Sequence, residues 1–183
     1  MTLKEVRVAS LGLDKSSNTP VVILQEKEGE RVLPIWIGPS EASAIAMEIA
    51  GMKFSRPLTH DLFTSLVRGL GSEVQRVIIT KVVENTYYAE LILSKNGEVI
   101  SIDARPSDSI AIALRTKAPI FARDELFDAT AIEIAPAEGF EGEGPEGEGG
   151  GTGEKEDVDA MNAEELKEYL KKLNPEDFGR FNP

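Results

Sequence analysis

The order of apolar and polar positions predicts two groups of β-strands in the first 135 residues. Some segments alternate with a period of two, which is typical of strands buried on one face, and others are continuous apolar runs, which are typical of strands covered on both faces. Turn-forming residues separate them, and the strongest such signal is Asn96-Gly97. The predicted strands are 3–13, 21–24 and 32–37 in the first group, and 73–83, 86–94, 98–103 and 119–122 in the second.

Two local features refine the first group of strands. The apolar phase of the first segment shifts between Val8 and Leu11, which predicts a β-bulge near Ala9. Pro34 lacks the N–H that a central strand would need for its ladder. We therefore expect the third strand to lie at an edge of the sheet, or to begin at this proline.

Three further segments have the apolar spacing of amphipathic helices. Thr59 is expected to cap the second helix, which the glycines at 69 and 71 close. The resulting order, β-β-β-α-α-β-β-β-α-β, predicts an α+β domain and not a series of alternating parallel βα units. The predicted helices are 39–50, 60–70 and 106–117.

A short repeat links the two groups of strands. Residues 37–46 and 104–113 are identical at five of ten positions, and Glu41 matches Asp108. Each copy follows a predicted strand and places proline at the first helical position, with an acid in the first turn, where the helix dipole favours negative charge. The repeat predicts a single compact domain, residues 1–135, made of two pseudo-repeated strand-rich halves with about three helices.

The remainder of the chain has a different composition. The whole chain has 32 acidic and 20 basic residues, of which 14 acidic and 5 basic residues lie in 136–183. This segment therefore has a charge of −9, and residues 1–135 have a charge of −3. The Gly/Glu-rich stretch 136–159 has too few apolar residues to offset the entropy of ordering, so we expect a disordered linker. Residues 160–183 are expected to hold a short amphipathic helix, near 163–173. This helix could fold back onto its own domain or dock onto another protein.

Composition excludes several classes of site. The chain has no cysteine, which excludes disulfides, zinc ribbons, iron–sulfur clusters and thiol nucleophiles. A metal would need oxygen ligands, with His60 as the single available imidazole. The sequence shows no signal-peptide pattern and no apolar run of about 18 residues, so we expect a cytoplasmic protein with no membrane contact. No organic cofactor is expected.

Three motifs carry a family resemblance. They are LPIWIGPSEA at 33–42, RPLTHDL at 56–62 and DARPSDSIAIALR at 103–115. In this order they resemble the bifunctional nuclease family, which has bacterial, archaeal and plant members, some of the latter credited with both DNase and RNase activity. The resemblance spans roughly residues 3–132. It implies a nuclease that acts on DNA and RNA with low sequence specificity, and we expect assistance from a divalent metal, Mg or Mn.

The motifs contain residue types that phosphodiester hydrolysis requires. Such chemistry needs carboxylates that hold a metal, or a general base and acid, together with arginine or lysine to stabilise the developing charge. Most of the candidates lie at strand ends or in first helical turns, where they could converge on one rim of the domain. The candidates are His60, Asp61, Asp108 and Glu41 for catalysis, Arg105, Ser107 and Arg115 for substrate binding, and Asp103 and Asp108 for a metal.

Each candidate also has a structural explanation. The two acids of the repeat can serve the helix dipole, and His60 can be an ordinary surface residue, although a helix N-terminus favours the neutral ring that a base requires. Arg105 opens a helix whose dipole opposes its charge, so an anion or a salt bridge to Asp103 or Asp61 would explain it better. Trp36 is expected in the core and not as a platform for stacking bases.

Two functions from different classes remain open. The family resemblance favours a nuclease, for which DNA or RNA is the partner as substrate. The near-neutral domain and its acidic tail favour a non-enzymatic regulatory or assembly module that binds protein partners, because phosphate contacts need Lys and Arg. The exposed sheet edges expected of two half-domains predict a homo-oligomer.

Overall fold

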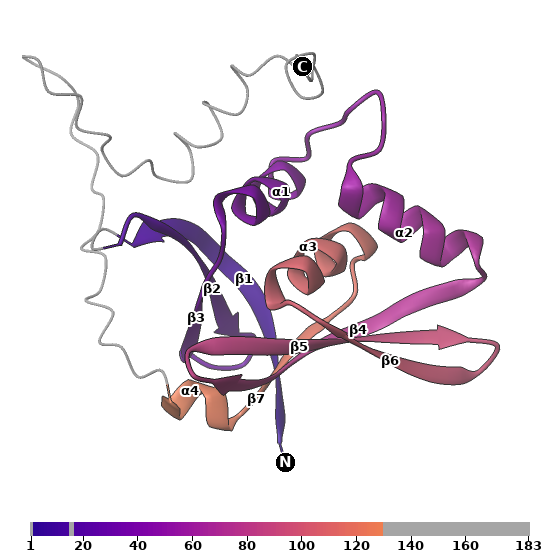
Figure 1. Ribbon diagram of the computed structural model, residues 1–183. Helices are drawn as coiled ribbons and strands as arrows, with labels where there is room; N and C mark the ends of the chain where they lie inside the picture. Colours follow the sequence, from indigo (N-terminus) through magenta and orange to yellow (C-terminus); the bar gives the residue numbers. More distant parts are fainter. Residues whose placement is uncertain (1, 15–16, 130–183) are drawn as a thin grey trace, which may run out of the picture.

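The computed structural model describes residues 2–14 and 17–129, so the predicted linker and C-terminal helix lie outside the described residues. Seven strands form one mixed sheet, in which the spatial order is β3-β2-β1-β7-β4-β5-β6 (Figure 1). The strands are β1 (Leu3–Asp14), β2 (Thr19–Glu26), β3 (Val32–Trp36), β4 (Ser72–Val83), β5 (Thr86–Lys95), β6 (Glu98–Ala104) and β7 (Ile120–Arg123).

The sheet consists of two antiparallel meanders on either side of β7. This last strand is antiparallel to β1 and parallel to β4. Each meander is followed by a helix, α1 (Pro39–Ile49) after β3 and α3 (Pro106–Thr116) after β6. The arrangement confirms the predicted α+β domain with two repeated strand-rich halves.

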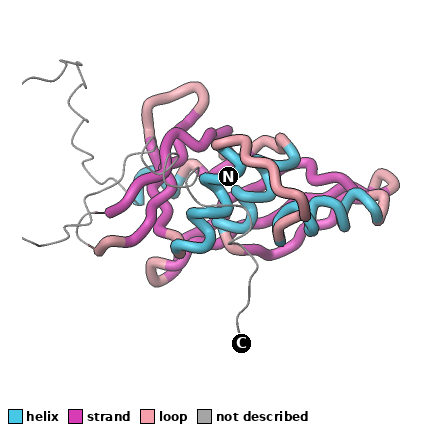
Figure 2. Tube along the Cα trace, turned by 90° about the horizontal axis from the view of Figure 1, so that it is seen from above, coloured by secondary structure: helices cyan, strands magenta, loops and turns pink. Residues whose placement is uncertain are grey.

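The helices are unevenly distributed around the sheet. Figure 1 shows α1, α2 (Thr59–Gly69) and α3 on one side of the strands, and Figure 2 shows them from above. The short helix α4 (Glu125–Ala129) lies apart from them and packs beside β3 and β7. It was not predicted, because five residues are too few to display a helical period. Across residues 2–14 and 17–129, no helix is long and apolar enough to span a membrane.

Several local predictions are confirmed, and one is wrong. The register of β1 shifts between Val8 and Ser10, β3 with its proline is an edge strand, and both residues of the Asn96-Gly97 turn have positive φ. Thr59 is not the cap of α2, however, but its first residue. The N-cap is Leu58, whose N–H donates to the Asp61 carboxylate at 2.9 Å.

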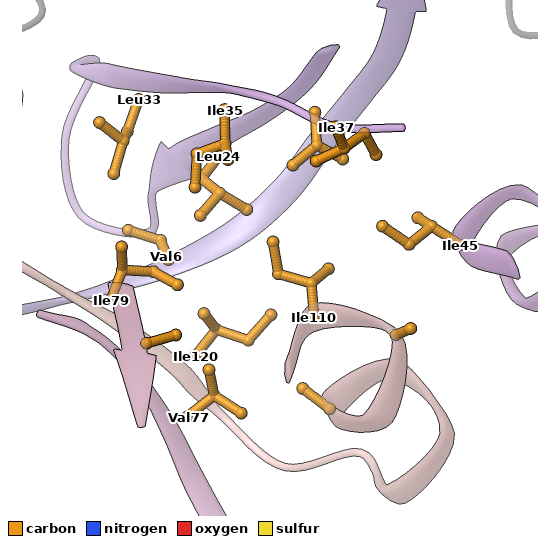
Figure 3. Packing of buried hydrophobic residues seen from close by; sticks show 14 of the residues in the cluster. Val6, Leu24, Leu33, Ile35, Ile37, Ile45, Val77, Ile79, Ile110 and Ile120 are labelled. Carbon is orange, nitrogen blue, oxygen red and sulfur yellow. The ribbon is translucent and has the colours of Figure 1, made fainter. Parts of the chain in front are cut away.

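The core lies between the sheet and helices α1 and α3 (Figure 3), and Phe63 of α2 packs against it. Ile120 of β7 pairs with Val6 on one side and with Val77 on the other, and all three side chains are buried. Ile110 of α3 and Ile45 of α1 are completely buried as well. The last strand therefore completes the core that both halves share, and α1 and α3 pack against each other beside it.

Candidate functional site

Arg105 connects the first turns of α1 and α3. It is the N-cap residue of α3, and its Nε and Nη2 donate to the Asp108 carboxylate at 2.7 and 3.2 Å. Its Nη1 lies 2.8 Å from Oε1 of Glu41 in α1. Gly38 leaves the space that Glu41 occupies, since a Cβ at this position would collide with Glu41 Oε2. Because the two acids are matching positions of the repeat, one guanidinium joins the two halves of the domain.

His60 in the first turn of α2 contacts the same carboxylate. Its Nε2 lies 3.2 Å from Oδ1 of Asp108, and both side chains are partly buried. When Nε2 donates this hydrogen bond, Nδ1 of the neutral ring keeps its lone pair. The predicted convergence on one rim is therefore confirmed for four residues from three helices, namely Glu41, His60, Arg105 and Asp108. We call these four residues the polar cluster.

Arg115 and Asp61 hold the same three helices together deeper in the domain. The Nε of Arg115 donates to Asp61 Oδ1 at 2.6 Å, and its Nη atoms donate to the carbonyl oxygens of Ala111 and Ala44 at 3.0 and 3.3 Å. The Glu48 carboxylate lies 3.8 Å away, and only 6% of the Arg115 side chain is exposed. The buried guanidinium is thus engaged in helix packing, and the predicted contact of Arg115 with substrate stays a prediction.

Pairing keeps two of these acids ionised. Burial by itself raises the pKa of Asp108, but hydrogen bonds from Arg105 and His60 outweigh it, so the pKa lies below its usual range. The pKa of Asp61 is lowered in the same way, because burial is outweighed by hydrogen bonds from Arg115 and from a backbone N–H. Both carboxylates therefore carry negative charge at neutral pH.

The structure does not join Asp103, the other predicted metal ligand, to the polar cluster. Asp103 is exposed in β6, opposite Glu90 of β5, while Asp108 is occupied by Arg105 and His60. The part of the chain that the structure describes contains no group of three or more Asp, Glu or His side chains placed to hold a metal ion. These donors do not fit a metal centre in this arrangement, and the need for Mg or Mn stays a prediction.

A cavity of about 270 Å³ lies beside Arg105. The end of β3, the first turns of α1 and α3, and the start of β5 form its walls, which include Tyr87 and the buried Ser107. Trp36 also lines it. The prediction that this tryptophan lies in the core is wrong, because β3 is an edge strand that ends here, and 40% of the residue is exposed. Its Nε1–H donates to Asp14 Oδ2 at 3.0 Å.

A second cavity, of about 610 Å³, lies between β1 and the C-terminal ends of α1 and α3. It is larger, but its walls are mainly apolar and include none of the predicted site residues. Size alone would favour this cavity as a binding site. Glu41 and the exposed guanidinium of Arg105 line the smaller cavity, so we place the candidate site at this cavity and the neighbouring His60–Asp108 pair.

Residues 22–135 match the Bifunctional nuclease domain family. The chain belongs to that family. A relative of this bifunctional nuclease domain protein, an uncharacterised protein of Mycobacterium tuberculosis, is 42% identical over 174 residues, which cover 95% of this chain and 97% of the relative. Bifunctional nuclease 2 of Oryza sativa subsp. japonica is 34% identical over 130 residues, 68% of this chain and 40% of the plant protein. Bifunctional nuclease 1 of Arabidopsis thaliana is 35% identical over 105 residues, 55% of this chain and 32% of the plant protein.

Sequence reasoning missed three residues of this region. Glu48 lies seven residues after Glu41 on α1, so helical spacing alone could have placed both on one face toward the arginines. Trp36 was assigned to the core from its strand pattern. Tyr87 had no local signal, because its place in the cavity depends on how the start of β5 meets the first turns of α1 and α3.

Proposed function

We propose that this bifunctional nuclease domain hydrolyses phosphodiester bonds of DNA and RNA at the polar cluster. The observation that carries the proposal is the 3.2 Å contact between His60 Nε2 and Asp108 Oδ1, with Arg105 bound to the same carboxylate. A base, a group that orients the base and a cation for the phosphate are thus adjacent. The names of the plant relatives support nuclease chemistry, although this chain spans less than half of their length.

In this proposal His60 acts as the general base. Asp108 holds the ring through Nε2, which leaves Nδ1 to take a proton from the attacking water or hydroxyl. The negative charge of Asp108 then stabilises the imidazolium that forms. A bound substrate brings the scissile phosphate toward Nδ1.

Arg105 supplies the positive charge for the phosphate. Its guanidinium has five N–H donors, of which three are engaged with Asp108 and Glu41, so two are available to phosphate oxygens. About two thirds of the side chain is exposed, since its relative accessibility is 65%. The negative charges of the two acids more than offset the charge of Arg105 in the free protein, so we expect weak binding that falls as salt rises.

The test compares nuclease rates of identically prepared proteins, because contaminating nucleases are a common source of activity. The double variant His60→Ala, Asp108→Ala is expected to lose at least about 100-fold in rate, the scale of general-base catalysis. Arg68→Ala is the matched control for Arg105→Ala, since it removes an equal charge from exposed α2 without touching the cluster. Rates measured with Mg, with Mn and with a chelator show whether a metal is needed.

Equal rates in the wild type and the double variant would mean that the activity does not arise at this site. If Arg68→Ala lowers the nuclease rate as much as Arg105→Ala does, the effect of Arg105 is only that of its positive charge on the domain as a whole. Retained activity in the chelator, together with loss in the double variant, would assign the reaction to the side chains alone.

A second candidate function is a protein-binding module that assembles copies of this chain. The observation in its favour is a stripe of leucines on the outer face of α2, where Leu62, Leu66 and Leu70 are 57–60% exposed. Soluble monomers seldom expose contiguous apolar patches. Sedimentation is expected to show an oligomer that Leu66→Glu dissociates, whereas Arg76→Glu on β4 does not. A wild-type monomer at high concentration would exclude this mode of assembly.

A further inference from the structure

We propose that the cavity beside Arg105 is a subsite for one base of a single-stranded nucleic acid, held against Trp36 and Tyr87. The proposal rests on the proposed function, because it takes nucleic acid to be the substrate. It adds a binding site separate from the His60–Asp108 pair and a preference for one form of the substrate. The aromatic walls, the hydroxyl of Ser107 and the free arginine donors carry it.

Trp36 is the first of these observations. A tryptophan is a large apolar surface, and leaving 40% of it exposed in a cavity is unfavourable unless something covers it. The hydrogen bond from its Nε1 to Asp14 restrains the indole ring. A restrained aromatic ring beside a cation is the arrangement with which proteins stack single-stranded bases, and it tolerates every base because each has a π face.

Polar groups in the same cavity suit the rest of a nucleotide. Ser107 is 7% exposed and lines the cavity, and within the described residues its side chain has no hydrogen-bond partner. The Ser107 hydroxyl can donate or accept a hydrogen bond, and a sugar or phosphate oxygen of a bound nucleotide would be a suitable partner. Arg105 lies in the same wall, and its two free N–H groups can bind a backbone phosphate.

The size of the cavity determines whether it accepts a single base or a base pair. At about 270 Å³ it lies just below the range of pockets for drug-sized molecules, so it admits one base and not a base pair. Bases of a duplex are stacked and paired, and a protein must pay a few kcal/mol of unstacking to extract one. The subsite therefore selects single strands, loops and ends over continuous duplex.

The experiment uses the full chain and its own fluorescence. Trp36 is the only tryptophan, so any change in tryptophan emission reports this cavity. Titration with a short oligothymidylate is expected to give saturable quenching, and a duplex of the same length is expected to bind at least about tenfold more weakly. Inorganic pyrophosphate, which offers phosphate without a base, is expected to leave the emission unchanged.

Two variants test the aromatic wall. Tyr87→Ala is expected to weaken oligothymidylate binding by about five- to 100-fold, the effect of removing one stacking partner. Tyr88→Ala is the matched control, since Tyr88 is the next residue of β5 and lies against Lys81, outside the cavity. Because Tyr87 also packs on the core, Trp36→Leu provides a second variant, read by the anisotropy of a labelled oligonucleotide.

The outcomes separate this proposal from the proposed function. Quenching without cleavage would support the subsite and overturn the nuclease. Cleavage that is lost in the His60 and Asp108 double variant would support the nuclease. If oligothymidylate then leaves the emission unchanged and Trp36→Leu binds the oligonucleotide as the wild type does, the subsite is overturned. Equal quenching by pyrophosphate and oligothymidylate, or equal losses in the Tyr87 and Tyr88 variants, would also overturn the subsite.

Discussion

The replacement of Arg115 by methionine removes a buried cation and keeps most of its aliphatic length. The guanidinium donates one charged hydrogen bond to Asp61 and two to main-chain carbonyls, and it lies near Glu48. Breaking a buried pair by removing one partner typically costs about 3–5 kcal/mol. Asp61 and Glu48 are 33% and 35% exposed, so water recovers part of that loss. We expect the free energy of unfolding to fall by about 2–3 kcal/mol.

Thermal and urea unfolding at neutral pH measure this change. For a domain of this size each kcal/mol shifts Tm by roughly 3–5 °C, so Arg115→Met is expected to melt roughly 6–15 °C below the wild type. Arg76→Met is the matched control, because Arg76 is exposed on β4 and has no ion pair among the described residues. Its stability is expected to stay within about 0.5 kcal/mol of the wild type.

The pH dependence identifies Asp61 as the partner. Its pKa is lowered in the folded protein, so its pairing adds stability above the unfolded pKa of about 3.9, and this stability is lost as pH falls through the folded pKa. The difference between Arg115→Met and the wild type is therefore expected to be full at pH 7 and to shrink below about pH 4. A methionine variant within 0.5 kcal/mol of the wild type, or a deficit that does not change with pH, would refute the reasoning.

Two further predictions concern other parts of the chain. Ser109→Ala is expected to raise the free energy of unfolding by up to about 1 kcal/mol, because the buried Ser109 hydroxyl has no partner among the described residues; a Tm below that of the wild type would show that it has one. A chain that ends at Ala135 is expected to melt at the wild-type temperature. It is also expected to bind oligonucleotide more tightly at low salt, because it loses a charge of −9. At high salt, which screens this charge, its affinity is expected to equal that of the wild type. A clear fall in Tm would show instead that the removed residues pack on the domain.

Local chemistry predicted most of the secondary structure. Proline at the first helical position, the acid after it and the Asn96-Gly97 turn each act within a few residues, so the sequence displays them directly. The order of strands is a different matter. Val6 and Ile120 pair across more than a hundred residues, and no local pattern distinguishes this pairing from others between apolar strands.

The site was also predictable only where local patterns in the sequence pointed to it. The repeat indicated that Glu41 and Asp108 were equivalent positions, and the dipole argument showed that Arg105 needed an anionic partner. Its partners were these repeat acids, and not the predicted Asp103 or Asp61. Burial was harder to predict, because helical spacing could not show that Arg115 lies inside the domain. Trp36 follows the pattern of a covered strand, yet its strand ends at an open edge.

The position of β7 has a consequence for how the chain reaches this fold. The last strand in sequence is the middle strand in space, so β1 and β4 each keep an open edge until Ile120–Arg123 is in place. Either meander alone would present that edge to other molecules. The two halves repeat each other but cannot be separate folding units. A chain cut between Gly71 and Ser72 is therefore expected to regain its structure only when both pieces are present.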